Sequence, residues 1–318
     1  MFYLNDEKNY KLVEILGTLL FMTLYALSGL VAFPILLIFF PIVSIYIGYK
    51  RGIVQSIFSS LIVSIIAGFI IDIYAGILLL ILFLPISLVI IYGLKTRRRP
   101  VEILSSSSVV FFISILLLLG YIQNSTGINF INIIEDIFGQ TLNVQLGLFE
   151  EMGLTNYEVL KYKDFFESGY KYFTWILPSI LILSSMLVSF INYYLSVLIL
   201  RKSGIGIVTI PRFSKFKLPN NFIPGIIIMF ITVYIFKSMN LPHYDTLFLN
   251  VAVFIYFMFV IQGLSVIDFY LVKAKLNLVL RSILIFVISV AAPLGTIISI
   301  IGVTDTIFDF RRFKKNKS

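Results

Sequence analysis

Long apolar runs separated by short charged turns fill most of this 318-residue chain. The first block is too long for one membrane span and is interrupted by Pro34 and Pro41. We therefore expect two helices there, about Ile15–Phe33 and Pro34–Gly48. Uncharged runs of about 17 or more residues can cross a hydrocarbon core of roughly 30 Å. The runs lack the alternation of barrel strands, so they predict helices.

The remaining runs complete an all-α fold, a polytopic transmembrane helix bundle of about 8–9 membrane segments. The last run is broken by Pro293 and Gly295. A single span there would place the basic C-terminal residues opposite the other basic turns, against the positive-inside rule. We favour a re-entrant or broken hairpin, which returns them. The other expected spans are Ile53–Ile71, Ala75–Leu94, Val101–Tyr121, Trp175–Leu200, Phe222–Phe236 and Thr246–Val272.

Basic residues follow alternate apolar runs, so they fall on one side of the membrane. Arg98 and Lys202 are examples, and the positive-inside rule makes this side cytoplasmic, together with the N-terminus. The acidic stretch 122–173 then becomes extracellular. Its apolar residues recur at helical spacing, as at Ile131 and Ile134, which predicts one or two amphipathic helices on the membrane surface.

The chain therefore divides into three expected parts. They are an N-terminal membrane half (1–121), with about five helices, the acidic extracellular loop (122–173), and a C-terminal membrane half (174–318) with basic cytoplasmic loops and tail. No small-residue cleavage site follows a short apolar core, so we expect the first run to be a retained span. The richness in Ile, Phe, Lys and Asn is typical of an AT-rich bacterial genome, and the expected location is the bacterial cytoplasmic membrane.

Composition supports the membrane assignment. The chain is 59% hydrophobic and 13% charged, whereas a soluble chain has about 25% charged residues. The net charge of +9 would suggest nucleic acid in a soluble protein. Here the basic cytoplasmic turns explain it, so we expect a lipid bilayer and no nucleic acid as partner.

The sequence offers no case for catalysis. Without cysteine there is no disulfide, thiolate nucleophile or cysteine-ligated metal. The sole histidine, His243, has only Asp245 nearby, which does not make a metal site. A nucleophile elbow, a zinc-protease motif and a phosphate-binding glycine loop are all absent from the sequence. We therefore expect no enzyme activity, no cofactor and no metal.

Few polar residues lie within the spans. Asp268 is the only acidic residue well inside one, and we expect it to pair with Lys273 or Lys275 rather than to couple a proton or cation. Asn192 and Gln262 could line a small-molecule pocket, together with Trp175, although span amides more often bond neighbouring helices and tryptophan is typical of an interfacial belt.

Two features could dock a partner. Ser28 and Ala32 form a small-xxx-small pair, which permits close helix approach inside the chain or to another protein. In the tail, Asp305, Asp309 and Arg312 lie at helical spacing, so that Asp309 and Arg312 can pair at i,i+3. With Arg311 they predict either a salt-bridged helix end at the anionic inner leaflet or a docking surface for a cytoplasmic partner.

Three stretches carry a family resemblance: Phe33–Gly52, Asn192–Pro219 and Gly302–Arg312. The pattern resembles the YybS-type family of bacterial multi-pass membrane proteins of unknown function, with Phe216 where that family usually has tryptophan. The family's first block is similar to the substrate-binding S components of energy-coupling-factor vitamin transporters. Those proteins have six helices and dock a transmembrane coupling subunit through small residues of the first helix. The extra helices and long loop here depart from them, and no substrate residue carries over.

Two functions follow as hypotheses. The first is a non-catalytic integral membrane protein acting as an S-component-like subunit for small-molecule binding or transport, with a coupling subunit as partner. The alternative is a membrane scaffold or interaction protein that organises envelope or signalling partners. A closed pocket ringed by aromatic and amide side chains would favour the first, and a solidly packed bundle the second. The sequence gives neither a substrate nor an oligomeric state.

Overall fold

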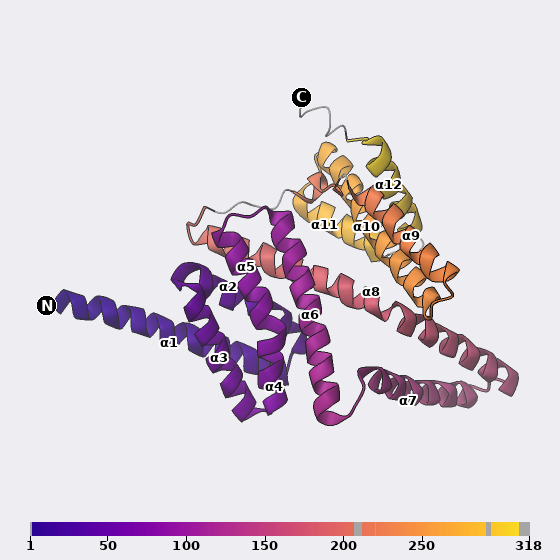
Figure 1. Cartoon of the computed structure of the whole chain (residues 1–318), viewed down its shortest axis with the longest axis horizontal. Coiled ribbons are helices and arrows are strands. Elements are labelled where there is room, and N and C mark those ends of the chain that lie inside the picture. The colour runs from indigo at the N-terminus through magenta and orange to yellow at the C-terminus, as the bar shows by residue number, and fades with distance from the viewer. Residues whose placement is uncertain (1, 207–211, 220, 291–293, 312–318) are drawn as a thin grey trace. The chain divides into compact units, whose positions relative to one another are not determined.

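The computed structural model describes residues 2–206, 212–219, 221–290 and 294–311, and the side chains of these residues from Glu14 onward except at 294. The described residues are helical with short connections and contain no strand, which confirms the all-α fold class (Figure 1). The chain forms two compact units. Unit 1 is the chain up to Val159 together with Leu181–Ile210, and unit 2 is Leu160–Ile180 together with the residues from Pro211.

Unit 1 follows the predicted spans closely, with one exception at its start. Its first helix already begins at Phe2, in the polar N-terminal stretch, rather than near Ile15. The elements of unit 1 are α1 (Phe2–Val31), η1 (Pro34–Phe39), α2 (Phe40–Arg51), α3 (Ile53–Ile70), α4 (Ile73–Leu78), η2 (Leu79–Phe83), α5 (Leu84–Lys95), α6 (Pro100–Thr126), α7 (Phe130–Glu151) and the later part of α8 (Asn156–Lys202).

Prolines mark the irregular turns of these helices. Pro34 opens the 3-10 helix η1, and Pro41 follows it, because proline lacks the backbone N–H that a continuous α-helix needs. Pro85 comes just after η2, which is a π-helical turn. Pro100 takes the first position of α6, where the N–H would have no intrahelical partner in any case.

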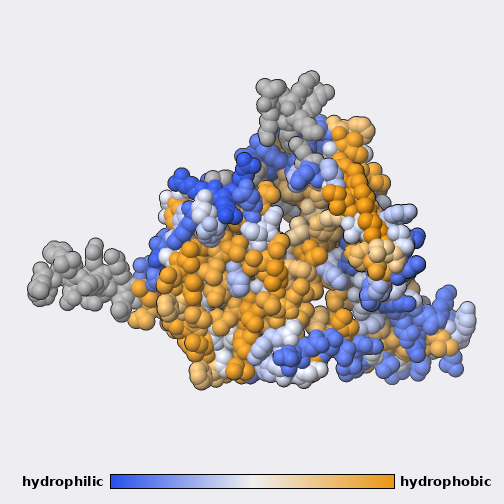
Figure 2. Space-filling view, viewed as in Figure 1, coloured by the Kyte–Doolittle hydropathy of each residue, from blue (hydrophilic) through white to orange (hydrophobic). Residues whose placement is uncertain are grey.

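The interior and the outer flank of unit 1 are both apolar. Phe40, Ile45 and Ile91 are buried in its core, and Leu200 of α8 packs with them. Figure 2 shows apolar residues covering the visible flank of helices α3–α6. Phe69 of α3 is 88% exposed. An apolar surface around an apolar core is what a lipid environment requires.

Unit 2 contains the predicted broken hairpin. Helices α11 and α12 are bent by 112° at the break, so the last apolar block is not one straight helix. The proline of the predicted hinge, Pro293, lies outside the described residues. The elements of unit 2 are the earlier part of α8, η3 (Phe213–Lys215), α9 (Phe222–Ser238), α10 (Tyr244–Lys273), α11 (Leu278–Val290) and α12 (Leu294–Phe308).

The described residues contain 7 helices long and apolar enough to cross a membrane, or 8 when α11 and α12 count as one broken span. The predicted number was about 8–9. The apolar helix α9 has 17 residues and falls just short of the length required. The fold is therefore a multi-pass bundle of membrane helices.

Helix α8 is longer than its predicted span. It runs for 47 residues from Asn156, after a capping box in which Thr155 and Glu158 satisfy each other's backbone N–H groups. The acidic stretch contains the amphipathic helix α7, as expected, but its second helical part is the polar beginning of α8. The predicted division after residue 173 falls inside this continuous helix, and the three-part membrane topology stays a prediction.

Asn250 of α10 inserts its side-chain amide into the backbone of α8 beside Pro178. In a regular helix the Ser179 N–H would donate to the Trp175 carbonyl. Here Ser179 N–H donates to Asn250 Oδ1 at 2.7 Å, and Asn250 Nδ2 donates to the Trp175 carbonyl at 2.7 Å. The Ser179 hydroxyl also donates to the Asn250 carbonyl at 2.8 Å. A side chain inserted in this way ties α8 to α10 within unit 2.

Candidate functional site

Two glycines bring helices α10 and α12 of unit 2 into backbone contact. A Cβ atom at Gly263 would lie 2.0 Å from the Ile298 carbonyl oxygen, and one at Gly302 would lie 2.0 Å from the Phe259 carbonyl oxygen. Neither position can accept even an alanine unless the helices separate. Small residues permit such close approach of helices in membranes. The polar site of unit 2 lies directly beside this contact.

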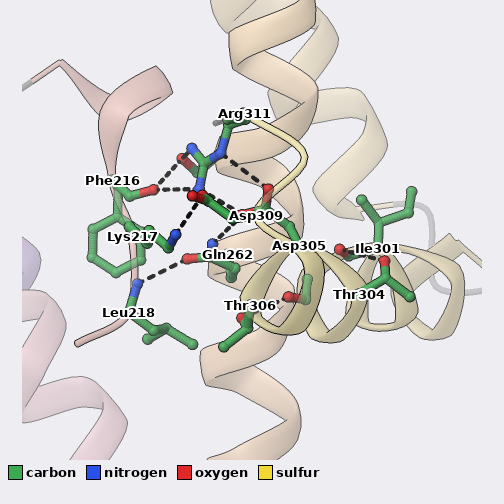
Figure 3. A network of polar contacts seen from close by, with 12 residues as sticks. Phe216, Lys217, Leu218, Gln262, Ile301, Thr304, Asp305, Thr306, Asp309 and Arg311 are labelled. Atoms are coloured by element: carbon green, nitrogen blue, oxygen red, sulfur yellow. Dashed lines mark hydrogen bonds and ion pairs between the residues drawn. The ribbon is translucent and has the colours of Figure 1, made fainter. Parts of the chain in front are cut away.

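Gln262 on α10 and Asp305 on α12 meet across the contact. Gln262 Nε2 donates to Asp305 Oδ2 at 2.6 Å, and Gln262 Oε1 accepts from the Leu218 N–H at 3.0 Å (Figure 3). Both side chains are buried. The single amide of Gln262 therefore links the two helices to the segment that contains Leu218.

Arg311, in the turn after α12, places its guanidinium in the same interior (Figure 3). Its Nη2 donates to Asp305 Oδ2 and to the Phe216 carbonyl, both at 2.8 Å, and its Nε lies 3.4 Å from Asp305 Oδ1. Its Nη1 donates to the Ser214 carbonyl at 3.0 Å and to Ser265 Oγ at 2.9 Å. All five guanidinium N–H groups thus have an acceptor. A buried charge is tolerated only when it is paired and bonded in this way.

The same network holds residues 212–219, which have no regular structure beyond the short helix η3. In addition to the bonds above, the Ser265 hydroxyl lies 2.7 Å from the Phe213 carbonyl and 2.9 Å from the Phe216 carbonyl. Lys217 forms an ion pair with Asp309. A segment that lacks helix or strand bonds is therefore fixed by side chains of α10 and of the turn after α12.

The predicted i,i+3 pair of Asp309 and Arg312 does not form on a helix, because α12 ends at Phe308. Asp309 has a φ of 51°, a left-handed conformation that ends helices, and its N–H donates back to the Asp305 carbonyl at 2.9 Å. Arg312 lies outside the described residues. Asp305 and Arg311 are interior residues of unit 2, so in this structure they do not form a docking surface.

Asp268 is buried and pairs with Arg281 of α11, not with Lys273 or Lys275 as the sequence suggested. Arg281 Nε lies 2.8 Å from one carboxylate oxygen and Nη2 lies 3.0 Å from the other, which is the bidentate geometry that arginine favours. The prediction failed because it considered only basic residues close to Asp268 in the sequence. The partner instead comes from the first turn of α11, which lies beside Asp268 in the fold. The carboxylate thus has a structural partner and joins two helices.

Unit 1 contains a different polar feature, on helix α8. Ser185, Ser189, Asn192 and Ser196 follow at i, i+4, i+7 and i+11, so they share one helix face, and all are buried. Asn192 Nδ2 donates to the Ile38 carbonyl and to the Val188 carbonyl, each at 2.9 Å. Asn192 therefore joins α8 to η1, within unit 1.

Three polar atoms on this face are unpaired. Ser189 Oγ, Asn192 Oδ1 and Ser196 Oγ have no hydrogen-bond partner among the described residues. An unpaired buried polar group costs about 1–3 kcal/mol. Ser64 Oγ on α3 is also unpaired, whereas Ser44 Oγ lies 2.7 Å from Ser56 Oγ. The α8 atoms differ because three of them share one helix face, and this grouping needs an explanation.

The three residues predicted to form a pocket belong to different units, and the shared pocket stays a prediction. Asn192 belongs to unit 1, whereas Gln262 and Trp175 belong to unit 2. Within unit 2, Trp175 meets α10 at Asn250, which is about 18 Å along the helix from Gln262 at 1.5 Å per residue. The Trp175 ring packs edge-on against Tyr172, and Lys171 Nζ lies 5.0 Å from the ring centre, an arrangement typical of an interfacial belt.

Ser28 is exposed on α1 and Ala32 is exposed in the turn after it, and the Ser28 hydroxyl donates back to the Tyr25 carbonyl at 2.8 Å. Docking of a partner at this pair stays a prediction. A groove of about 260 Å³ lies between α3 and α4, and its lining is apolar except for Ser64. The described residues contain no group of three metal-binding side chains.

Sequence reasoning missed several residues of these sites. Ser265, Lys217 and Arg281 were not recognised as partners of buried groups, and Asn250 was not singled out at all. A signal existed for Asn250, because an amide inside a membrane span usually bonds a neighbouring helix. The other three residues offered no sequence signal, because their partners lie far away along the chain.

The fold and its buried sites define a helical, multi-pass integral membrane protein. The chain belongs to the family described as "Predicted membrane protein (DUF2232)", whose model matches residues 15–306. Neither the curated proteins nor the solved structures gave a match.

Proposed function

We propose that this protein is a non-catalytic membrane scaffold or interaction protein, and that residues 212–219 form the part that meets a partner. The supporting observation is the buried network of Gln262, Ser265 and Arg311, which fixes this segment. Irregular segments are usually mobile at a protein surface. Holding one in place avoids an entropic cost when a partner binds it.

The exposed side chains of the segment suggest the chemistry of the partner. Arg212 and Lys215 are exposed and have no acidic partner among the described residues. Phe213 lies between them in the sequence, is also exposed, and stacks on Phe216 with ring centres 6.4 Å apart. An acidic segment that also carries an apolar residue suits this surface. The positive-inside rule places the segment on the cytoplasmic side of a bacterial membrane, with the acidic stretch around α7 outside.

Affinity purification from native membranes, followed by mass spectrometry, tests this function. The double variant Arg212→Ala/Lys215→Ala removes two exposed charges and should lose the partner while remaining folded. The matched control, Arg201→Ala/Lys202→Ala, removes two exposed charges from the end of α8 and should keep it. Equal recovery of every partner from both variants would exclude a docking role for residues 212–219.

A second candidate function is a subunit for small-molecule binding or transport, as the resemblance to S components implies. The observation that favours it is the set of unpaired polar atoms on α8. Native mass spectrometry of the purified protein should then detect a bound small molecule. Ser28→Leu or Ala32→Leu should remove a co-purifying coupling subunit without unfolding the protein, because leucine would hold the helices apart. A wild-type protein without any bound molecule or coupling subunit would speak against this second function.

A further inference from the structure

The polar face of α8 departs from the usual behaviour of serine in a helix. A helical serine generally donates its hydroxyl to the carbonyl four residues earlier, as Ser185 does to Leu181 at 2.7 Å. The hydroxyls of Ser189 and Ser196 are buried, yet make no such bond and have no other partner among the described residues. Both are therefore available to an external donor or acceptor.

Asn192 lies between these serines on the same face and is held in one orientation. Its Nδ2 donates to the Ile38 carbonyl, whose 3-10 partner would be the nitrogen of Pro41, which has no hydrogen. With Nδ2 engaged, Asn192 Oδ1 remains as an unpaired acceptor. The three unpaired atoms follow one helix face over about 10 Å at 1.5 Å per residue.

The surroundings of this face are uncharged. Among the described residues of unit 1, the buried polar side chains are serines and Asn192, and none is charged. A charged molecule placed here would lose its hydration without gaining a counter-charge. A neutral molecule with hydroxyl or amide groups could bond all three atoms at little cost.

We infer that Ser189, Asn192 and Ser196 form a buried binding site for a small, elongated, uncharged polar molecule. The inference rests on the second function proposed above and gives it a location and a ligand class. The hydroxyls can donate or accept, and Asn192 Oδ1 accepts, so the ligand must carry at least one donor opposite Asn192.

Single cysteines test the site, because the chain contains no native cysteine. Ser189→Cys and Ser196→Cys are close in size to the native residues. Each should react with 2-hydroxyethyl methanethiosulfonate, a small neutral polar reagent that stands in for the ligand class. The anionic 2-sulfonatoethyl reagent should react at least about ten times more slowly, because a charge loses far more than a hydroxyl on leaving water.

Two further cysteine variants serve as the unreactive and the reactive control. Ser87→Cys replaces a buried serine whose hydroxyl donates to the Phe83 carbonyl at 2.7 Å, and it should remain unreactive toward both reagents. Asn143→Cys is exposed on α7 and should react with both. Folding of each variant is checked by gel filtration and by its thermal midpoint.

Protection of both α8 cysteines from the neutral reagent, in folded protein, overturns the site. Equal rates with the neutral and anionic reagents overturn the uncharged ligand class. Either result concerns α8 alone. Native mass spectrometry would still detect a small molecule bound elsewhere, so failure of this site and failure of the second function can be told apart.

Discussion

The interiors of the two units use opposite kinds of polarity. Among the described residues, the buried polar side chains of unit 1 are neutral hydroxyls and one amide, three of which have an unpaired atom on α8. Unit 2 buries Asp268, Asp305 and Arg311, and each has a bidentate or fully bonded partner. Unit 1 thus buries polar atoms that have no hydrogen-bond partner, whereas the buried charged groups of unit 2 are paired.

The difference follows from what each kind of group costs in lipid. A buried charge without a partner is so unfavourable that neighbouring groups must be arranged to pair with it. A neutral hydroxyl without a partner costs about 1–3 kcal/mol, which a fold can tolerate where a ligand restores the bond. The comparison therefore predicts that the interior of unit 2 is more sensitive to loss of a polar partner than that of unit 1.

The largest effect is expected from breaking the buried pair of unit 2. Asp305→Asn keeps the shape of the side chain but removes the Asp305 charge that pairs with the guanidinium of Arg311. The expected loss in the free energy of unfolding is about 3–5 kcal/mol. Titration with sodium dodecyl sulfate in mixed micelles, followed by circular dichroism, measures it.

A surface pair provides the matched control. Lys163 and Glu167 lie 3.8 Å apart, and both side chains are about half exposed. Glu167→Gln should cost no more than about 1 kcal/mol, because water screens such pairs. Similar losses for both variants would mean that the Asp305–Arg311 pair is not buried as described.

The glycine contact between α10 and α12 should give the next largest effect. Gly302→Ala places a methyl group against the Phe259 carbonyl and should destabilise unit 2 by about 1–3 kcal/mol. Gly225→Ala, on α9, has open space around its Cβ position and should not destabilise. If the two alanine variants unfold at the same detergent concentration, the helices do not touch at Gly302.

The contrast between the units could be predicted from the sequence only in part. Apolar runs and prolines located the helices, including the break in the last block, because membrane spans must be long, apolar and helical. Amides in the spans marked Asn192 and Gln262 as noteworthy. The pairing of Arg311 with Asp305 and of Arg281 with Asp268 could not be predicted, because helical spacing describes neighbours on one helix and says nothing about a turn that folds back.

A smaller effect is expected at the insertion of Asn250 into α8. Asn250→Ala removes the amide that bridges the Ser179 N–H and the Trp175 carbonyl. These two backbone groups can then bond each other as in a regular helix, so the loss should be only about 1 kcal/mol. A loss of more than about 3 kcal/mol would contradict this, because it would mean that the two backbone groups stay unpaired in the variant.

The smallest effect, and the one that separates the units most clearly, concerns Ser189. Removing a buried hydroxyl that has no partner removes a cost, so Ser189→Ala should leave the free energy of unfolding of the ligand-free protein unchanged or slightly raised. Ser87→Ala deletes a hydroxyl of the same unit that donates to the Phe83 carbonyl, and it should lose about 1 kcal/mol. Both are serine-to-alanine changes at buried helical positions, so side-chain size and helix propensity cancel in the comparison. A loss at Ser189 as large as that at Ser87 would mean that the Ser189 hydroxyl already has a partner in the protein.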